Sequence, residues 1–365
     1  MAPSANASLL RLLTLLTICA VASFAAPSFI GPLNSIRDVG STVPPIGDIN
    51  PYGVAVVPTT TGALRAQHVL VSNFNNSMNF QGTGITIVQI GPDGGLSVFA
   101  QIDATKLPGP CPGGVGLTTA LVVLRSGWVI VGSLPTANGM SPTAMAGCLL
   151  VLNSSGTVME TISGGDINGP WDMTALDMGS TAMLFVTNVL DGTVAANGGT
   201  VTNGTVVRIG LSIPVSGMPM VTSNTIIGSG FSQRTDPGAL VIGPTGLGLG
   251  GDGVLFVADT LANRIAAIPN AIARTNSAGT GVTITGGGGL NGPLGLAMAP
   301  NGNILVVNSG DGNMVETTKG GMQVAVKNVD NTGTGAGTLF GLAIAPNGQS
   351  VYLVNDGSNK LDLLH

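Results

Sequence analysis

The chain has 365 residues, a net charge of −5 and only 8% charged residues, against about 25% in an average soluble protein. Hydrophobic residues make up 44%, so the chain can bury a sizeable core in one large domain or two ordinary ones. No run of lysine or arginine occurs, which argues against nucleic acid or an anionic membrane surface as a partner. The 57 glycines favour many tight turns between short strands.

The first 25 residues have the pattern of a signal peptide. Arg11 is followed by the apolar run LLTLLTICAVASFA, which is too short to span a bilayer as a helix. The sequence SFA, ending at Ala25, fits the small-x-small cleavage rule, and AVA, ending at Ala22, fits it too. The alternative is an uncleaved anchor. No later segment resembles a membrane span, so we expect a secreted, extracellular or periplasmic protein.

Cleavage would remove Cys19 and leave Cys111 and Cys148. Two cysteines in an exported chain predict one disulfide, although two buried free thiols are the alternative. The bond would close a loop of 37 residues. It would contribute about 3–4 kcal/mol in the chain-entropy model.

The chain repeats itself. The segment PLGLAMAPNGNILVVN, from Pro293, aligns without a gap to PTGLGLGGDGVLFVAD, from Pro244, at a shift of 49 residues. Four other segments share the pattern of a glycine, a short apolar strand, a turn and a second apolar strand that ends in a polar residue. The six polar residues are Asn73, Ser133, Asn188, Asp259, Asn308 and Asn355. Four short strands per unit at this period are typical of a propeller blade.

We therefore predict an all-β, six-bladed β-propeller of four-stranded blades over residues 50–365. The predicted blades cover approximately residues 50–112, 113–167, 168–243, 244–290, 291–336 and 337–365. The last unit lacks a fourth strand, and residues 26–49 form no blade of their own. We predict that this N-terminal segment supplies the missing outer strand and closes the ring, which removes a sheet edge.

The segments GVLFVADTLANRI (Gly253–Ile265) and GPLGLAMAPNGNILVVNSGDGNMV (Gly292–Val315) resemble NHL-type propeller repeats. The resemblance covers most of the chain and implies the propeller fold. It does not imply an activity, because such folds host enzymes, receptors and scaffolds. The basic residue that usually follows the polar turn survives only as Arg264.

Five of the recurring polar residues are candidate ligand-binding groups: Asn73, Asn188, Asp259, Asn308 and Asn355. Their recurrence first favours a structural role, because Asn and Asp cap tight turns by accepting backbone hydrogen bonds. In the alternative, some of them line one face and bind a ligand, Ca²⁺ or another divalent metal.

Asp172 departs from the repeat. The equivalent positions hold Gly53, Ala120, Gly246, Gly295 and Gly341, all of them small. The neighbouring Trp171 aligns with the aromatic residues Tyr52 and Phe340 of two other blades. A single carboxylate near the mouth of the central channel, flanked by aromatic residues, is the best site hypothesis. The alternative is an aspartate that caps its own loop, with Trp171 packing between blades.

The inventory of catalytic groups is small. The two histidines, His68 and His365, have no motif-like context, and we expect Glu160 and Glu316 to be solvated on outer strands. NHL-like amidating lyases use histidine-bound zinc, and lactonase-like propellers use a glutamate near the channel. The sequence has neither at a matching position. Neither a catalytic residue nor a metal ligand is therefore assigned.

Long loops follow the second strands of the first three predicted blades. On a rigid scaffold such loops often carry binding. The first functional hypothesis is a binding or scaffold protein that recognises a protein, glycan or small molecule through this loop-rich face. The alternative is a metal-dependent, lactonase-like hydrolase or lyase at the channel mouth, with a divalent metal near Asp172.

Overall fold

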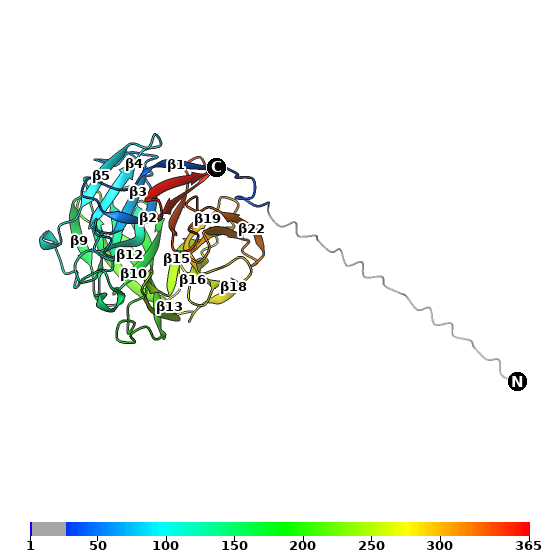
Figure 1. Cartoon of the computed structure of the whole chain (residues 1–365). Helices are drawn as coiled ribbons and strands as arrows, with labels where there is room; N and C mark the ends of the chain where they lie inside the picture. The colour runs from blue at the N-terminus through cyan, green and yellow to red at the C-terminus, as the bar shows by residue number, and fades with distance from the viewer. Residues whose placement is uncertain (2–26) are drawn as a thin grey trace.

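The computed structural model describes residue 1 and residues 27–365 and shows six antiparallel sheets around a central axis (Figure 1). The signal-peptide prediction and Cys19 fall on residues 2–26, outside the described part of the chain. Blade one comprises β2 (Ile49–Val56), β3 (Val69–Asn75), β4 (Thr86–Ile90) and β5 (Leu96–Gln101). Blade two comprises β6 (Leu117–Val123), β7 (Val129–Ser133), β8 (Cys148–Leu152) and β9 (Val158–Ile162).

The other blades follow in chain order. Blade three comprises β10 (Pro170–Asp177), β11 (Thr181–Asn188), β12 (Val201–Ser212), β13 (Met220–Asp236) and β14 (Leu240–Ile242). Blade four comprises β15 (Pro244–Leu249), β16 (Leu255–Asp259), β17 (Arg264–Ile268) and β18 (Val282–Gly286). Blade five comprises β19 (Pro293–Met298), β20 (Ile304–Asn308), β21 (Asn313–Thr317) and β22 (Gln323–Asn328). Blade six comprises β23 (Leu339–Ile344), β24 (Val351–Asn355), β25 (Lys360–Leu364) and β1 (Ile36–Ser41).

The second strand of every blade is apolar and buried, as the repeat predicts. Strands β7, β16, β20 and β24 are buried along their whole length. Hydrophobic clusters between neighbouring blades provide the core. Two short 3₁₀ turns, η1 (Ala104–Lys106) and η2 (Ser141–Thr143), lie in the loops. No helix among the described residues is long and apolar enough to cross a membrane.

The first strands of neighbouring blades approach each other closely, and this explains the recurring glycine. A Cβ atom on Gly295 would collide with the carbonyl oxygen of Phe340 in the next blade. A Cβ on Gly341 would likewise collide with the carbonyl oxygen of Tyr52. The repeated glycines are therefore a packing requirement at the centre of the ring.

The prediction of ring closure by the N-terminal segment is confirmed. Strand β1 pairs antiparallel with β25, from Ile36 opposite Leu364 to Ser41 opposite Lys360. The segment before β1 is fixed separately by Glu316, which we expected to be solvated. That expectation is wrong, because Glu316 is fully buried. Its carboxylate accepts hydrogen bonds from Ser28 Oγ at 2.6 Å, Phe29 N at 2.8 Å and Ile30 N at 2.9 Å.

Blade three departs from the four-stranded pattern. Strand β13 is 17 residues long, and its end folds back through a turn to pair with β14, from Arg234 opposite Ile242 to Asp236 opposite Leu240. The Asp236 carboxylate holds this turn by accepting from Gly238 N at 2.9 Å. The repeat contained no sign of the fifth strand, because this strand occurs in one blade alone.

The predicted disulfide is confirmed. Cys111, in the loop before β6, is bonded to Cys148, the first residue of β8, with 5.2 Å between their Cα atoms. It connects the loop that enters blade two with the end of the long loop between β7 and β8. A disulfide fits an oxidising compartment such as the extracellular space or the periplasm.

Candidate functional site

A cavity of about 330 Å³ lies on the central axis, between the first strands of all six blades. One apolar side chain from each blade contributes at an equivalent register position: Val54, Leu121, Met173, Leu247, Leu296 and Leu342. The lining continues to Leu124 and Asp177, where these strands turn into the second strands. The cavity therefore opens on the face that carries the turns between first and second strands.

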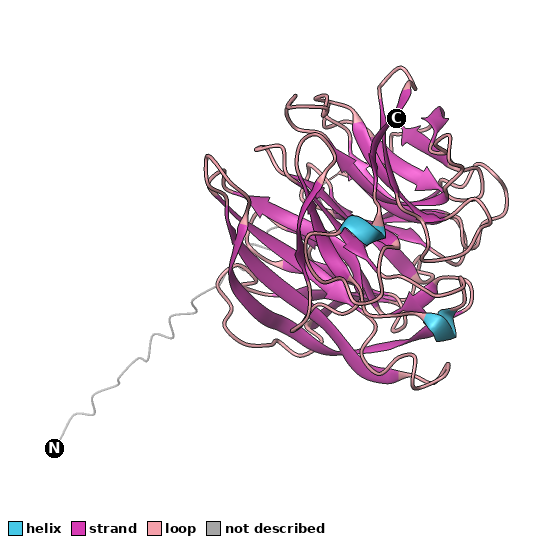
Figure 2. Ribbon diagram, turned by 90° about the vertical axis from the view of Figure 1, so that its left-hand side faces the viewer, coloured by secondary structure: helices cyan, strands magenta, loops and turns pink. Residues whose placement is uncertain are grey.

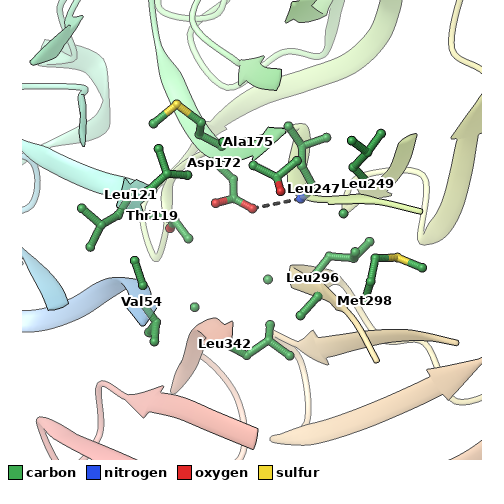
Figure 3. Close-up of a pocket in the computed structure, with 18 of the residues that line it drawn as sticks. Val54, Thr119, Leu121, Asp172, Ala175, Leu247, Leu249, Leu296, Met298 and Leu342 are labelled. Atoms are coloured by element: carbon green, nitrogen blue, oxygen red, sulfur yellow. Dashed lines mark hydrogen bonds between the residues drawn. The ribbon is translucent and has the colours of Figure 1, made fainter. Parts of the chain in front are cut away.

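Asp172 lies at the inner end of this cavity (Figure 3). It is the third residue of β10, and its side chain is only 7% exposed. Its Oδ2 atom accepts a hydrogen bond from the backbone N–H of Leu247, in the next blade, at 2.9 Å. Asp172 thus does not simply cap its own loop, as one sequence interpretation held. It connects the first strands of blades three and four.

The backbone around Asp172 is held by a hydroxyl group. Asp172 N donates to Thr187 Oγ1 at 3.0 Å, and that hydroxyl donates to the carbonyl oxygen of Thr245 at 2.9 Å. Ser72 makes the same bridge in blade one, accepting from Gly53 N at 2.9 Å and donating to the Thr118 carbonyl at 2.7 Å. The position of Asp172 is therefore fixed by a hydroxyl bridge that blades one and three share.

The carboxyl group of Asp172 has unusual acid–base properties. Burial raises its pKa from 3.8 to about 7, and hydrogen bonds from the backbone N–H groups of Leu247 and Met173 oppose that rise only partly. Near neutral pH the group therefore exists in comparable amounts of its acid and carboxylate forms. An acid with this pKa in a cavity is a candidate functional group.

The opposite end of the channel is closed by an aromatic plug, formed by Tyr52, Phe74, Trp171 and Phe340. The Tyr52 ring stacks on Phe340 at a centroid distance of 3.9 Å and on Phe74 at 4.3 Å, with Trp171 at 6.3 Å. All four residues are buried. The predicted grouping of Tyr52, Trp171 and Phe340 is thus present, but these rings lie behind Asp172 in the core and do not line the cavity.

The loop-rich face covers this plug. Leu134 and Leu190, from the long loops of blades two and three, and Leu240 and Val241, from β14, belong to the same buried cluster as the plug. Figure 2 shows the sheets from the side, with loops at both ends of the strands. Among the described residues, the plug blocks the cavity on the face of the long loops, so the cavity is open only on the opposite face.

The five candidate polar residues at the ends of second strands are all buried, and none of them lines the cavity. Asn73 Nδ2 donates to the Thr42 carbonyl at 3.0 Å, and Asn188 Oδ1 accepts from Asn168 N at 3.2 Å. Their polar groups hold loops of the protein itself.

The other three candidates do the same. Asp259 forms an ion pair of 2.8 Å with Arg264, Asn308 Nδ2 donates to the Gly289 carbonyl at 2.8 Å, and Asn355 Nδ2 donates to Asp330 Oδ1 at 2.9 Å. The structure therefore brings together Asp172 and the apolar wall of the channel, and it leaves these five residues apart from them.

Three other polar residues of the cavity, Thr119, Thr174 and Asp177, were not predicted from the sequence. In five blades the register between the first and second strands shifts by one residue near the start of the first strand. In blade two it shifts by two residues between Leu117 and Leu121. This extra residue places Thr119, as well as Ala120, at the level of Asp172. The Thr119 hydroxyl is buried and has no hydrogen-bond partner.

The residues around Asp172 do not fit a metal ion. Ca²⁺ takes six to eight oxygen ligands, several of them carboxylates. Asp172 is the single carboxylate at the inner end of the cavity, and the lining adds only the hydroxyls of Thr119 and Thr174. No group of three or more His, Cys, Asp or Glu side chains among the described residues could hold a metal. The donor set of the cavity therefore supports no step that depends on a metal.

No protein-family model matches the chain, and no curated protein sequence matches it. Solved structures share the fold. A gluconolactonase from Xanthomonas campestris has a TM-score of 0.54 at 11% identity, covering 91% of this chain and 95% of its own. A calcium-binding regucalcin from Agrobacterium tumefaciens has a TM-score of 0.51 at 12% identity, covering 90% and 93%.

A nidogen/laminin complex contributes a chain with a TM-score of 0.50 at 11% identity, covering 80% of this chain and 84% of its own. At such identities the similarity establishes the propeller fold alone. The NHL-type repeats therefore remain a sequence resemblance. The similar structures include enzymes and a complex between proteins, so the function must be argued from the site.

Proposed function

We propose that this protein is an exported binding protein that holds a small molecule in the central channel, with Asp172 as its polar anchor. The observation that supports this best is a cavity of about 330 Å³, closed at one end by the aromatic plug and carrying a buried carboxyl group there. Ligand pockets commonly have volumes of about 300–1,000 Å³, apolar walls and a few placed polar groups.

A binding role fits the cavity better than the alternative of a metal-dependent hydrolase or lyase. General acid–base catalysis of hydrolysis needs a second group, or a metal-bound water, within reach of the same substrate atom. The other acid in the lining, Asp177, lies five residues along β10, which corresponds to about 16 Å in an extended strand. Its carboxylate already accepts from Arg125 N at 2.7 Å and Gly179 N at 2.9 Å.

The proposal also moves the binding site away from the face favoured by sequence. Leu134 and Leu190 of the long loops pack inward on the aromatic plug. Met78, Phe80, Met140 and Met145 of the same loops are exposed, but they do not line the central cavity. The channel instead offers an enclosed cavity with a carboxyl group, backbone groups and apolar side chains, open on the opposite face.

The test uses three probes with one apolar body: 2-cyclohexylethanol, 2-cyclohexylethylammonium and 3-cyclohexylpropanoate. Saturation-transfer NMR would measure binding to the wild-type chain and to Ala175→Trp and Ala297→Trp. Both alanines line the cavity and are half-exposed, so each indole would narrow it from a different blade. Ala104→Trp, at an exposed position in η1, is the matched control.

We expect at least one probe to bind the wild type and the control, and to be lost from both channel variants while their circular dichroism is unchanged. If no probe binds the wild type, or if both narrowed channels bind as well as the control, the proposal is wrong.

A further inference from the structure

We propose that the channel selects ligands with a positively charged amine on an apolar body, and that Asp172 is the counter-ion. This inference rests on the proposed function and specifies the chemical class of its ligand. Three properties of the cavity support it: the sign of its charges, the carboxyl and backbone acceptors at its inner end, and the apolar side chains that flank the axis.

The charges of the lining have one sign. Asp172 at the inner end and Asp177 at the rim are its two titratable side chains, and it contains no lysine, arginine or histidine. An anionic ligand would therefore meet carboxylates and no counter-charge, at a site where burial strengthens electrostatic interactions. A cation entering from the rim would meet attractive charge at both levels.

The inner end offers hydrogen-bond acceptors that suit an ammonium group. The Asp172 carboxylate accepts from Leu247 N–H at 2.9 Å, and the backbone N–H of Met173 also stabilises it, which leaves acceptor capacity on a group with up to four lone-pair sites. The Thr119 hydroxyl lies at the same level of the channel, but its oxygen has almost no exposed surface. Figure 3 shows the Asp172 side chain facing the cavity. An ammonium group has three donors and no acceptor, so the Asp172 carboxylate would be its charged partner.

Backbone groups extend the acceptor set. The first strand of each blade is the last member of its sheet, so the edge that faces the axis has no partner strand. Such an edge presents alternating N–H and C=O groups. The N–H of Leu247 already donates to Asp172, which shows that this strand edge can make polar contacts.

The side chains around the axis restrict the remainder of the ligand. Leucine, valine and methionine side chains from all six blades flank the axis, and no charged group lies between the levels of Asp172 and Asp177. Those at the inner level are each less than 10% exposed, so backbone groups of the strand edges make up much of the lining. A compact apolar body would contact the exposed edges of these side chains, at about 25 cal/mol per Å² of apolar surface removed from water.

The affinity for the amine should also depend on pH. A bound ammonium group stabilises the ionised form of Asp172, so affinity for the amine should rise as pH increases through the pKa of about 7. Asp177, at the rim, is the other titratable group of the lining. The neutral alcohol should bind with little dependence on pH over the same range.

The experiment compares the dissociation constants of 2-cyclohexylethylammonium and 2-cyclohexylethanol by isothermal titration calorimetry at pH 5.5 and pH 8. We expect the amine to bind at least tenfold more tightly at pH 8. Asp172→Asn should weaken it by about 10–100-fold, which corresponds to the loss of one hydrogen bond to a charged group. The same change should alter the affinity of the alcohol by less than about threefold, because that contact is between neutral groups.

Asp191→Asn, at an exposed position on the loop-rich face, is the matched control and should leave both affinities unchanged. If alcohol and amine bind the wild type equally, or if Asp172→Asn leaves the amine affinity intact, the amine inference is wrong and the binding function stands. If neither compound binds, the proposed function fails as well.

Discussion

Replacing Asp172 by asparagine should make the protein more stable at pH 8. The carboxyl group is buried, and burial raises its pKa from 3.8 to about 7. The folded protein therefore keeps this proton up to about pH 7, whereas the unfolded chain loses it near pH 3.8. Between these values the folded state binds more protons, so stability falls as pH rises through this window and stays low above it.

The magnitude follows from the two pKa values. At about 1.36 kcal/mol per pH unit, the change from 3.8 to about 7 corresponds to at most about 4 kcal/mol. Asparagine has nearly the same shape, carries no charge and can accept the hydrogen bond from Leu247 N–H with its amide oxygen. We therefore expect Asp172→Asn to raise the free energy of unfolding by about 2–4 kcal/mol at pH 8, with little change at pH 4.

Urea denaturation of the wild type, Asp172→Asn and the control Asp191→Asn at pH 4, 6 and 8 measures this difference. Comparison with the wild type is essential, because burial also raises the pKa of Asp356 and of Asp362 to about 6, and both act in the same direction. If Asp172→Asn is less stable than the wild type at pH 8, or shows the same pH dependence, the argument from burial is refuted.

Three further predictions concern the ring and its closure. Glu316→Gln should lower the free energy of unfolding by about 2 kcal/mol, since it weakens hydrogen bonds to a charged acceptor. Burial raises the pKa of Glu316, but hydrogen bonds from Phe29, Ser28, Asn301 and Asn303 outweigh it and hold that pKa below 4.5. This contribution should thus be complete above pH 4.5 and disappear as pH falls through the folded pKa, which urea denaturation from pH 2.5 to 6 would show. Deleting residues 29–45 removes β1 and should prevent stable folding, and a soluble truncated protein with cooperative unfolding would contradict this. Replacing Cys111 and Cys148 by serine should lower stability by about 3 kcal/mol, and an unchanged midpoint in urea would contradict that estimate.

The repeat predicted the architecture because a propeller imposes the same local constraints in every blade. Four of the six blades have a glycine where first strands touch, and every blade has a buried second strand, and both leave a pattern in sequence. The short last unit also predicted the closing strand, since a ring cannot leave one blade with an unpaired edge. The disulfide followed from the count of cysteines in an exported chain.

Only one residue of the candidate site was predicted from the sequence, at the position where blade three departs from the repeat. Asp172 stood out because it replaces a glycine, but the repeat could not show which end of the channel is open. That depends on the way β14 and the long loops pack over Tyr52 and Trp171, and these segments have no counterpart in other blades. Thr119 was missed because an extra residue in β6 changes the register of one blade alone.

The environment of Glu316 was missed for a related reason. Its position on an outer strand predicted solvation, yet the segment at residues 28–30 covers it and supplies three hydrogen bonds. Contacts between residues almost 290 positions apart leave no local signal in the sequence.

The most direct test of this account is a carboxyl ¹³C NMR titration of Asp172, with the resonance assigned by its absence in Asp172→Asn. We predict a pKa of about 7 in the free protein. The pKa should be clearly lower when 2-cyclohexylethylammonium is bound, because the cation stabilises the carboxylate. A pKa near 3.8 in the free protein, or a value that does not change with the bound amine, would contradict both the buried anchor and its proposed role.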